Sequence, residues 1–196
     1  MLVTIAGING LWLAKESNYS VLIIGAISIF AGIKYTRGRR PFAAIALGEV
    51  IAFIFLGIVV PTLAYVVQTN EVSLEIILVS FPFGFLIITM VLTNNIRDIG
   101  KDAPVRMTLA ILLGRRRSVQ LLALVFLATY LTVIILILLR IVSPIALCTF
   151  FALPACLKVL SLFTKKVPKT SEIKAMKWAA IHHLTFGILF ATSLWV

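Results

Sequence analysis

The sequence predicts an all-α membrane protein, a polytopic bundle of about seven transmembrane helices that forms one domain over residues 1–196. Hydrophobic residues make up 61% of the chain and charged residues 13%, and the mean hydropathy is +1.12, far above that of soluble domains. Seven apolar runs approach the length of about 20 residues that a helix needs to cross a bilayer. The sequence shows no long linker or low-complexity tract, which favours a single membrane-embedded unit.

The first three apolar runs lie in the N-terminal third of the chain. Residues 1–14 are short for a span and have no basic region before them, unlike a signal peptide, so we expect a helix that continues from something upstream. Residues 17–34 follow a polar turn and end at a basic cluster. Residues 42–67 form a longer apolar run, which predicts a full membrane span.

The remaining four runs cover residues 74–95, 119–139, 142–163 and 178–196. The first of them ends at a polar stretch into which its helix can continue. Pro154 is expected to kink the helix of residues 142–163, because proline lacks the N–H that an interior turn requires. Trp178 and Trp195 stand at the two ends of the final run, as in an aromatic belt.

The net charge of +11 is spread between the apolar runs, which favours the positive-inside rule over a nucleic-acid partner. With Met1 inside, the connections on the inner side hold all of the 18 basic residues except Lys15 and Arg140. This pattern predicts a C-terminus outside the cell. It also places Asp98 and Asp102 on the cytoplasmic side of the plasma membrane.

Asp98 and Asp102 are the only aspartates of the chain and lie just past an apolar run. Residues four apart share a helix face, so Asn94, Asp98 and Asp102 are expected to form one stripe, which ends near Ala103 because a proline follows. Two carboxylates and an amide make an oxygen half-site suited to Mg²⁺, an ion that proteins hold by one or two carboxylates together with substrate phosphates. The stripe predicts a magnesium site.

Basic residues surround this stripe. Guanidinium groups offer paired donors to phosphate oxygens, so these side chains can take the remaining charge of a diphosphate; they are Arg97, Lys101, Arg106 and residues 115–117. The alternative is that two acids in a polar loop only balance basic residues that fix the topology.

Glu49 lies inside the apolar run of residues 42–67. An ionisable group within a membrane segment is costly and usually faces a polar interior, which favours a place at a substrate cavity. The alternative is a structural partner for Arg37, Arg39 or Arg40 near the headgroups.

Two separated motifs resemble the UbiA superfamily of intramembrane prenyltransferases, and within it the 1,4-dihydroxy-2-naphthoate polyprenyltransferases of menaquinone biosynthesis. The second aspartate-rich motif of that family, N-N-x-R-D-x-x-x-D followed by T-L-A-x-x-L-G, is matched by Asn94, Asn95, Arg97, Asp98 and Asp102, and then by Arg106, Thr108, Leu109, Ala110, Leu113 and Gly114. The segment Y-T-x-G…P…L-G-E is matched by Tyr35, Thr36, Gly38, Pro41, Leu47, Gly48 and Glu49.

The chain also departs from the family. The first aspartate-rich motif, N-D-x-x-D-x-x-x-D, is absent, since no third aspartate exists. By this resemblance the chain is similar to the C-terminal seven helices of a nine-helix fold and is N-terminally incomplete. Residues 103–107 are one residue shorter than the family's segment and lack its Gly-Lys, which puts one diphosphate contact in doubt.

The resemblance implies transfer of a polyprenyl group from an allylic diphosphate to an aromatic quinone precursor, with Mg²⁺ neutralising the departing diphosphate. It assigns Asp98 and Asp102 as catalytic metal ligands. The implied substrate contacts are Asn94, Asn95, Arg97, Lys101, Arg106, Glu49 and Tyr35. Tyr35 either stacks on the prenyl cation or anchors the membrane interface, where tyrosine is common.

Two other interpretations stay open. The chain can be a catalytically incomplete fragment, or one subunit of a split enzyme whose first two helices come from a separate N-terminal subunit. It can also be a small transporter with basic cytoplasmic loops, although internal repeats and broken polar helices near the midplane, which transporters tend to show, are not evident.

Overall fold

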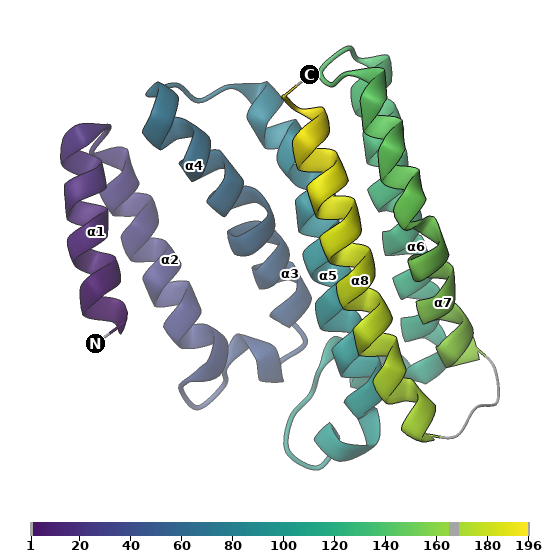
Figure 1. Ribbon diagram of the computed structural model, residues 1–196. Helices are drawn as coiled ribbons and strands as arrows, with labels where there is room; N and C mark the ends of the chain where they lie inside the picture. Colours follow the sequence, from purple (N-terminus) through teal and green to yellow (C-terminus); the bar gives the residue numbers. More distant parts are fainter. Residues whose placement is uncertain (1, 165–168, 196) are drawn as a thin grey trace.

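The computed structural model describes residues 2–164 and 169–195, which fold into helices joined by short connections (Figure 1). The first half contains α1 (Leu2–Glu16), α2 (Ser20–Thr36), a 3₁₀ turn (Phe42–Ala44), α3 (Gly48–Ala52), a π-helical segment (Phe53–Val59) and α4 (Val60–Thr69). The second half contains α5 (Leu74–Asp102), α6 (Leu109–Leu138), a 3₁₀ segment (Pro144–Ala152), α7 (Leu153–Thr164) and α8 (Lys169–Ser193). The prediction of an all-α fold is confirmed.

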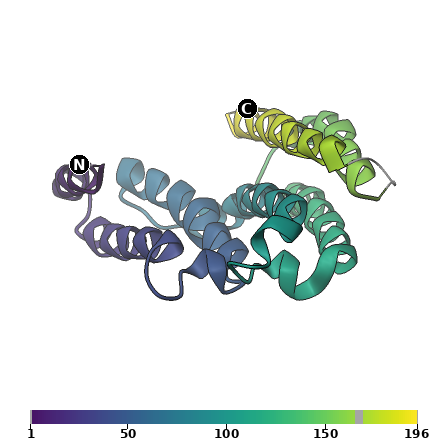
Figure 2. The same cartoon turned by 90° about the horizontal axis from the view of Figure 1, so that it is seen from below.

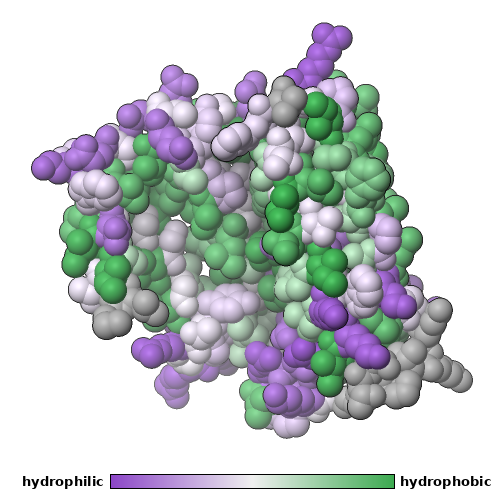
Figure 3. All heavy atoms as spheres, viewed as in Figure 1, coloured by the Kyte–Doolittle hydropathy of each residue, from purple (hydrophilic) through white to green (hydrophobic). Residues whose placement is uncertain are grey.

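Within the described residues, four helical stretches are long and apolar enough to cross a membrane, namely Gly48–Thr69, Leu74–Asp102, Leu109–Leu138 and Pro144–Thr164. The helix α2 is apolar but shorter. The helix α8 is long, but its first turns carry Glu172, Lys174 and Lys177, and two histidines interrupt its apolar run. On the face shown in Figure 3, hydrophobic residues cover most of the middle, and hydrophilic residues gather towards the upper and lower ends. The chain is therefore an integral membrane protein.

Two of the predicted boundaries are wrong on their N-terminal side. The membrane helix predicted over 42–67 begins at Gly48, because residues 42–47 form a 3₁₀ turn and a loop. The helix predicted over 119–139 begins at Leu109 instead, capped by the Thr108 hydroxyl, which accepts a hydrogen bond from the backbone N–H of Ile111. Gly114 then bends the chain with φ 74°, a left-handed value that glycine adopts without steric cost.

The two C-terminal segments also differ from prediction. Residues 144–152 form a 3₁₀ helix that becomes α-helical at Leu153. Pro154 lies at this changeover, where its missing N–H cannot bond to the Phe150 carbonyl as an α-helix requires. The helix predicted from residue 178 begins at Lys169, because its polar first turns continue the helix beyond the apolar run.

The helix α5 occupies the centre of the molecule and packs against α6, α8 and the π-helical segment. Its buried face carries Leu92 and Ile96, which share a core cluster with Phe126 of α6. Leu86 of the same helix belongs to a second cluster with Tyr130 of α6 and Phe186 of α8. Seen from below, the helices form a curved layer with α1 and α2 at one end and α7 and α8 at the other (Figure 2). This arrangement brings the C-terminal end of α5 next to the loops that follow α2.

Candidate active site

Two loops and two helix ends meet at one end of the bundle. The helix α5 continues past its apolar residues to Asp102, and Pro104 follows two residues later. The loop of residues 103–108 then leads into α6, while the loop of residues 37–47 joins α2 to α3 at the same end (Figure 1). The polar residues of the two predicted motifs are thereby gathered in one region.

Arg97 and Asp98 form the first polar group of this region. The Arg97 guanidinium donates to both carboxylate oxygens of Asp98, with Nε–Oδ1 at 2.9 Å and Nη2–Oδ2 at 2.6 Å. The same Nη2 donates to Asn94 Oδ1 at 2.7 Å. The Asp98 side chain keeps 20% of its surface exposed, so it is accessible to a ligand from solvent.

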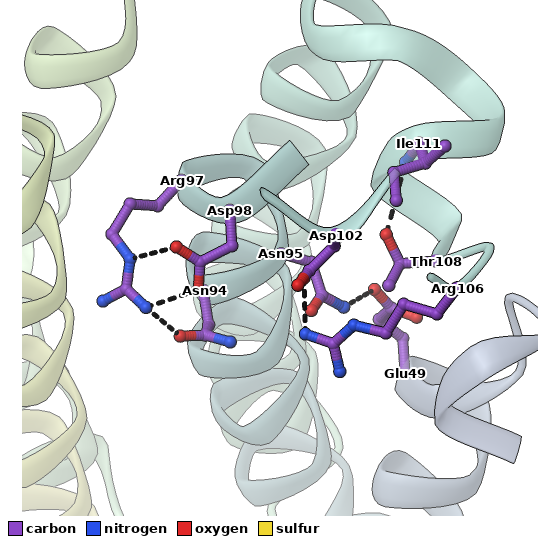
Figure 4. Close-up of polar contacts among 9 residues, drawn as sticks. All are labelled: Glu49, Asn94, Asn95, Arg97, Asp98, Asp102, Arg106, Thr108 and Ile111. Atoms are coloured by element: carbon purple, nitrogen blue, oxygen red, sulfur yellow. Dashed lines mark hydrogen bonds and ion pairs between the residues drawn. The ribbon is translucent and has the colours of Figure 1, made fainter. Parts of the chain in front are cut away.

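Asp102, Arg106, Asn95 and Glu49 form the second polar group. The Arg106 guanidinium forms an ion pair with Asp102, which is buried. Glu49 of α3 is also buried and accepts a hydrogen bond at 2.8 Å from the Asn95 amide of α5. This hydrogen bond ties α3 to α5 near Asp102 and Arg106 (Figure 4).

The two groups lie on different sides of the end of α5 (Figure 4). Each aspartate is paired with its own arginine, and no group of three or more His, Cys, Asp or Glu side chains that could hold a metal occurs within residues 2–164 and 169–195. Each aspartate can nevertheless supply one carboxylate to Mg²⁺, an ion that proteins hold by one or two carboxylates while water and substrate phosphates complete its octahedral oxygen ligands. Asp98 and Asp102 are the residues that would hold the ion.

A cavity of 380 Å³ lies beside the second group. Its wall combines Arg106 with the amides of Asn94 and Asn95, and the rest comes from Tyr35, Thr36, Ala43, Gly48, Met90 and Val91. A second cavity of 390 Å³ lies between α2 and the α3–α4 stretch and is almost entirely apolar. Tyr35 and Val91 line both cavities, so a polar compartment is followed directly by an apolar one.

The other predicted contacts are placed differently. Lys101 is exposed, whereas Arg115 pairs with Glu172 at 3.0 Å and lies over the Phe163 ring, 5.6 Å from its centre. Arg115 therefore joins α6 to α7 and α8 and does not line the cavity beside Arg106. Among the described residues, no ion pair joins Glu49 to Arg37, Arg39 or Arg40.

The pairing of Glu49 with Asn95 gives a first prediction. We expect Glu49→Ala to lower the free energy of unfolding by about 1–3 kcal/mol, because the buried Asn95 amide loses its acceptor. Glu49→Gln keeps a carbonyl oxygen at this position and should lose less. Thermal unfolding of both variants in detergent checks the order, and equal losses would contradict a role for the hydrogen bond.

Sequence reasoning missed the residues that join the two loops. The Ala46 N–H donates to the Met107 carbonyl at 2.8 Å, and the Met107 N–H donates to the Ala44 carbonyl at 3.1 Å. Backbone bonds of this kind leave no residue-type signal. Ala43 and Met90, which line the cavity, were also missed because nothing in their side chains points to ligand binding.

Compared with known proteins, the chain has several relatives that share its sequence. The chain is 32% identical over 191 residues to a 1,4-dihydroxy-2-naphthoate octaprenyltransferase of Bacillus subtilis, covering 97% of this chain and 61% of that protein. A protein with the same name from Escherichia coli is 35% identical over 81 residues, which cover 41% of this chain and 26% of that protein. Another from Mycobacterium tuberculosis is 31% identical over 117 residues, which cover 59% of this chain and 40% of that protein. The chain thus spans less than two thirds of the length of these relatives.

No solved structure matches the chain. The model of the UbiA prenyltransferase family matches residues 1–181, a range that includes both motifs and all the candidate site residues. The chain therefore belongs to the UbiA prenyltransferase family.

Proposed function

We propose that this protein transfers a polyprenyl group from an allylic diphosphate to an aromatic quinone precursor, 1,4-dihydroxy-2-naphthoate. The observation that carries the proposal is the polar cavity beside Arg106, which continues into an apolar cavity at Tyr35 and Val91. A polyprenyl diphosphate has the same division into a charged head and an apolar tail. The names of the relatives support the acceptor and the reaction.

The residues of the site have separable roles in this proposal. Arg106, on the wall of the polar cavity, donates to diphosphate oxygens, as a guanidinium can with two parallel N–H groups. Arg97 holds Asp98 in place through two hydrogen bonds. Mg²⁺ held by Asp98 and Asp102 would supply charge neutralisation for the departing diphosphate.

Tyr35 lies where the two cavities meet. In the proposed complex its ring faces the carbon that separates the diphosphate from the apolar tail. An aromatic face attracts a nearby positive charge, so Tyr35 can stabilise the allylic cation that forms when the diphosphate leaves. The apolar walls of the second cavity keep water from that cation.

The proposal includes an orientation in the membrane. The site end carries the loops that are rich in arginine, and basic loops are kept on the cytoplasmic side. We therefore place the site at the cytoplasmic face of the plasma membrane. A cysteine introduced at exposed Arg39 should react with an impermeant thiol reagent only in inside-out vesicles.

Prenyl transfer in membranes that contain this chain tests the proposal. The assay supplies Mg²⁺, allylic diphosphates of increasing length and 1,4-dihydroxy-2-naphthoate, and mass spectrometry detects the prenylated product. A parallel assay adds a family N-terminal fragment with the first aspartate-rich motif. Product in the first assay supports a working enzyme, product in the second alone supports a split enzyme, and its absence from both contradicts the proposed activity.

A further inference from the structure

The two loops at the site end are joined by their backbones. The Ala46 N–H donates to the Met107 carbonyl at 2.8 Å, the Met107 N–H donates to the Ala44 carbonyl at 3.1 Å, and Ile45 and Met107 form an isolated parallel β-bridge. We call the backbone groups of Ala44, Ala46 and Met107 the loop clasp. It connects segments that are about 60 residues apart in sequence, as a comparison of their numbers shows.

The loop clasp lies directly next to Arg106. The Arg106 N–H donates to the Asp102 carbonyl at 3.0 Å on one side, and Met107 is fixed by the clasp on the other. Arg106 lines the polar cavity together with Ala43 and Gly48, which flank the Ala44–Ala46 half of the clasp. The clasp therefore ties together two parts of the cavity wall, one beside each loop.

Ala46 adopts a backbone conformation that its residue type does not favour. Its φ is 58°, in the left-handed region that residues other than glycine enter in only a few per cent of cases. This conformation allows the Ala46 N–H to point at Met107. Uncommon φ values of this kind persist where surrounding structure holds them and gather at functional sites.

We propose that the loop clasp is a positioning element of the diphosphate site and that Ala46 is its positioning residue. The clasp fixes the separation of these two parts of the cavity wall and so places the Arg106 guanidinium where it meets the phosphate oxygens. This inference rests on the proposed function, because it assigns a role to the same cavity. It adds a residue whose side chain touches no substrate.

Ala46→Pro tests the clasp, because proline has no N–H and fixes φ near −65°. The probe is farnesyl diphosphate with Mg²⁺, titrated onto the purified full chain in detergent. We expect Ala46→Pro to raise its dissociation constant about tenfold, and Arg106→Gln to do the same. The double variant should bind the probe no more weakly than whichever single variant binds it less tightly, since the effects of two changes that act through one contact do not add.

Asn70 offers a matched control. It also has φ 58°, and its N–H donates to the Val66 carbonyl at 2.8 Å at the end of α4, at the opposite end of the bundle. Asn70→Pro therefore disturbs the backbone in the same way without touching the site, and its dissociation constant should stay within twofold of the wild type. Ala46→Gly, which fits φ 58° and keeps the N–H, should retain the affinity that Ala46→Pro loses.

Hydrogen exchange measures the clasp without reference to any substrate. The peptide that contains Met107 should exchange faster in Ala46→Pro than in the wild type and remain protected in Asn70→Pro. If Ala46→Pro does not fold, Ala46→Val replaces it, because a β-branched side chain disfavours φ 58° while it keeps the N–H.

The outcomes separate the inference from the proposed function. Unchanged affinity in Ala46→Pro together with weakened affinity in Arg106→Gln would overturn the inference and leave the diphosphate site intact. A wild-type chain that does not bind the probe, or an Arg106→Gln variant that binds it normally, would overturn the diphosphate site itself. Equal weakening by Asn70→Pro would assign the loss to general destabilisation and so reject the clasp.

Discussion

Asp98→Asn and Asp102→Asn are each expected to lower the rate of prenyl transfer by at least about 100-fold, the range seen when one electrostatic contact to a developing charge is removed. Each change keeps the size of the side chain but removes a negative charge that Mg²⁺ requires. The Asp98 position should tolerate the change structurally, because an amide oxygen can still accept one hydrogen bond from Arg97. The measurement is the rate at saturating diphosphate over a series of Mg²⁺ concentrations.

Glu75→Gln is the matched control for both aspartates. Glu75 lies in the first turn of the same helix, is exposed and stands at the opposite end from the site. Its change to an amide removes one negative charge from α5 without touching the candidate metal ligands, so the rate should stay close to that of the wild type. A similar loss of rate in Glu75→Gln would assign the effect to the removal of a negative charge from α5 and not to the loss of a metal ligand.

The dependence on Mg²⁺ distinguishes the two interpretations of the aspartates. If Asp98 and Asp102 hold the ion, the surviving activity of either variant should require more Mg²⁺ for half-saturation. If they only balance Arg97 and Arg106, whose guanidinium groups they bind, both variants should keep the rate and the Mg²⁺ dependence of the wild type. Such a result would contradict the metal site.

Much of the fold could be predicted because a membrane helix appears in the sequence as a continuous run of apolar residues. Each apolar run contains α-helix, although the runs of 42–67 and 142–163 also include 3₁₀ or π-helical segments, and Pro104 marked the end of α5 within two residues. Helix ends were less predictable where polar residues continue a helix beyond the bilayer, as at Lys169, or where a single φ bends it, as at Gly114. Such features depend on local hydrogen bonds that hydropathy does not describe.

The structure gathers the candidate residues at one end of the bundle, but their pairing could not be predicted from the sequence. Residues four apart share a helix face, yet Asp98 pairs with its neighbour Arg97 because the long arginine side chain folds back along the helix. The hydrogen bond between Glu49 and Asn95 needs α3 to dock on α5, which a sequence pattern does not reveal. The loop clasp likewise uses backbone groups, so only the three-dimensional structure shows it.

The contact between Gly57 and Gly84 gives the largest expected effect on stability. A Cβ on Gly57 would lie 2.2 Å from the Cα and 2.9 Å from the N of Gly84, so the π-helical segment and α5 must separate to accept it. Small residues permit such close approach of membrane helices. We expect Gly57→Ala to cost about 3 kcal/mol, at the upper end of usual overpacking, and to lower the unfolding temperature by about 10 °C.

Two other glycines make this prediction specific. A Cβ on Gly84 would meet the ring of Phe53 at 2.6 Å, and a side chain can shift where a backbone cannot, so Gly84→Ala should cost less than Gly57→Ala. Gly187 of α8 has nothing within 4 Å of an added Cβ, and alanine is the better helix former by about 1 kcal/mol, so Gly187→Ala should leave stability unchanged or raise it. Thermal unfolding in one detergent ranks the three variants. A Gly57→Ala variant as stable as Gly187→Ala would show that α5 and the π-helical segment do not approach this closely. It would also contradict the position of Glu49, which lies four residues before that segment.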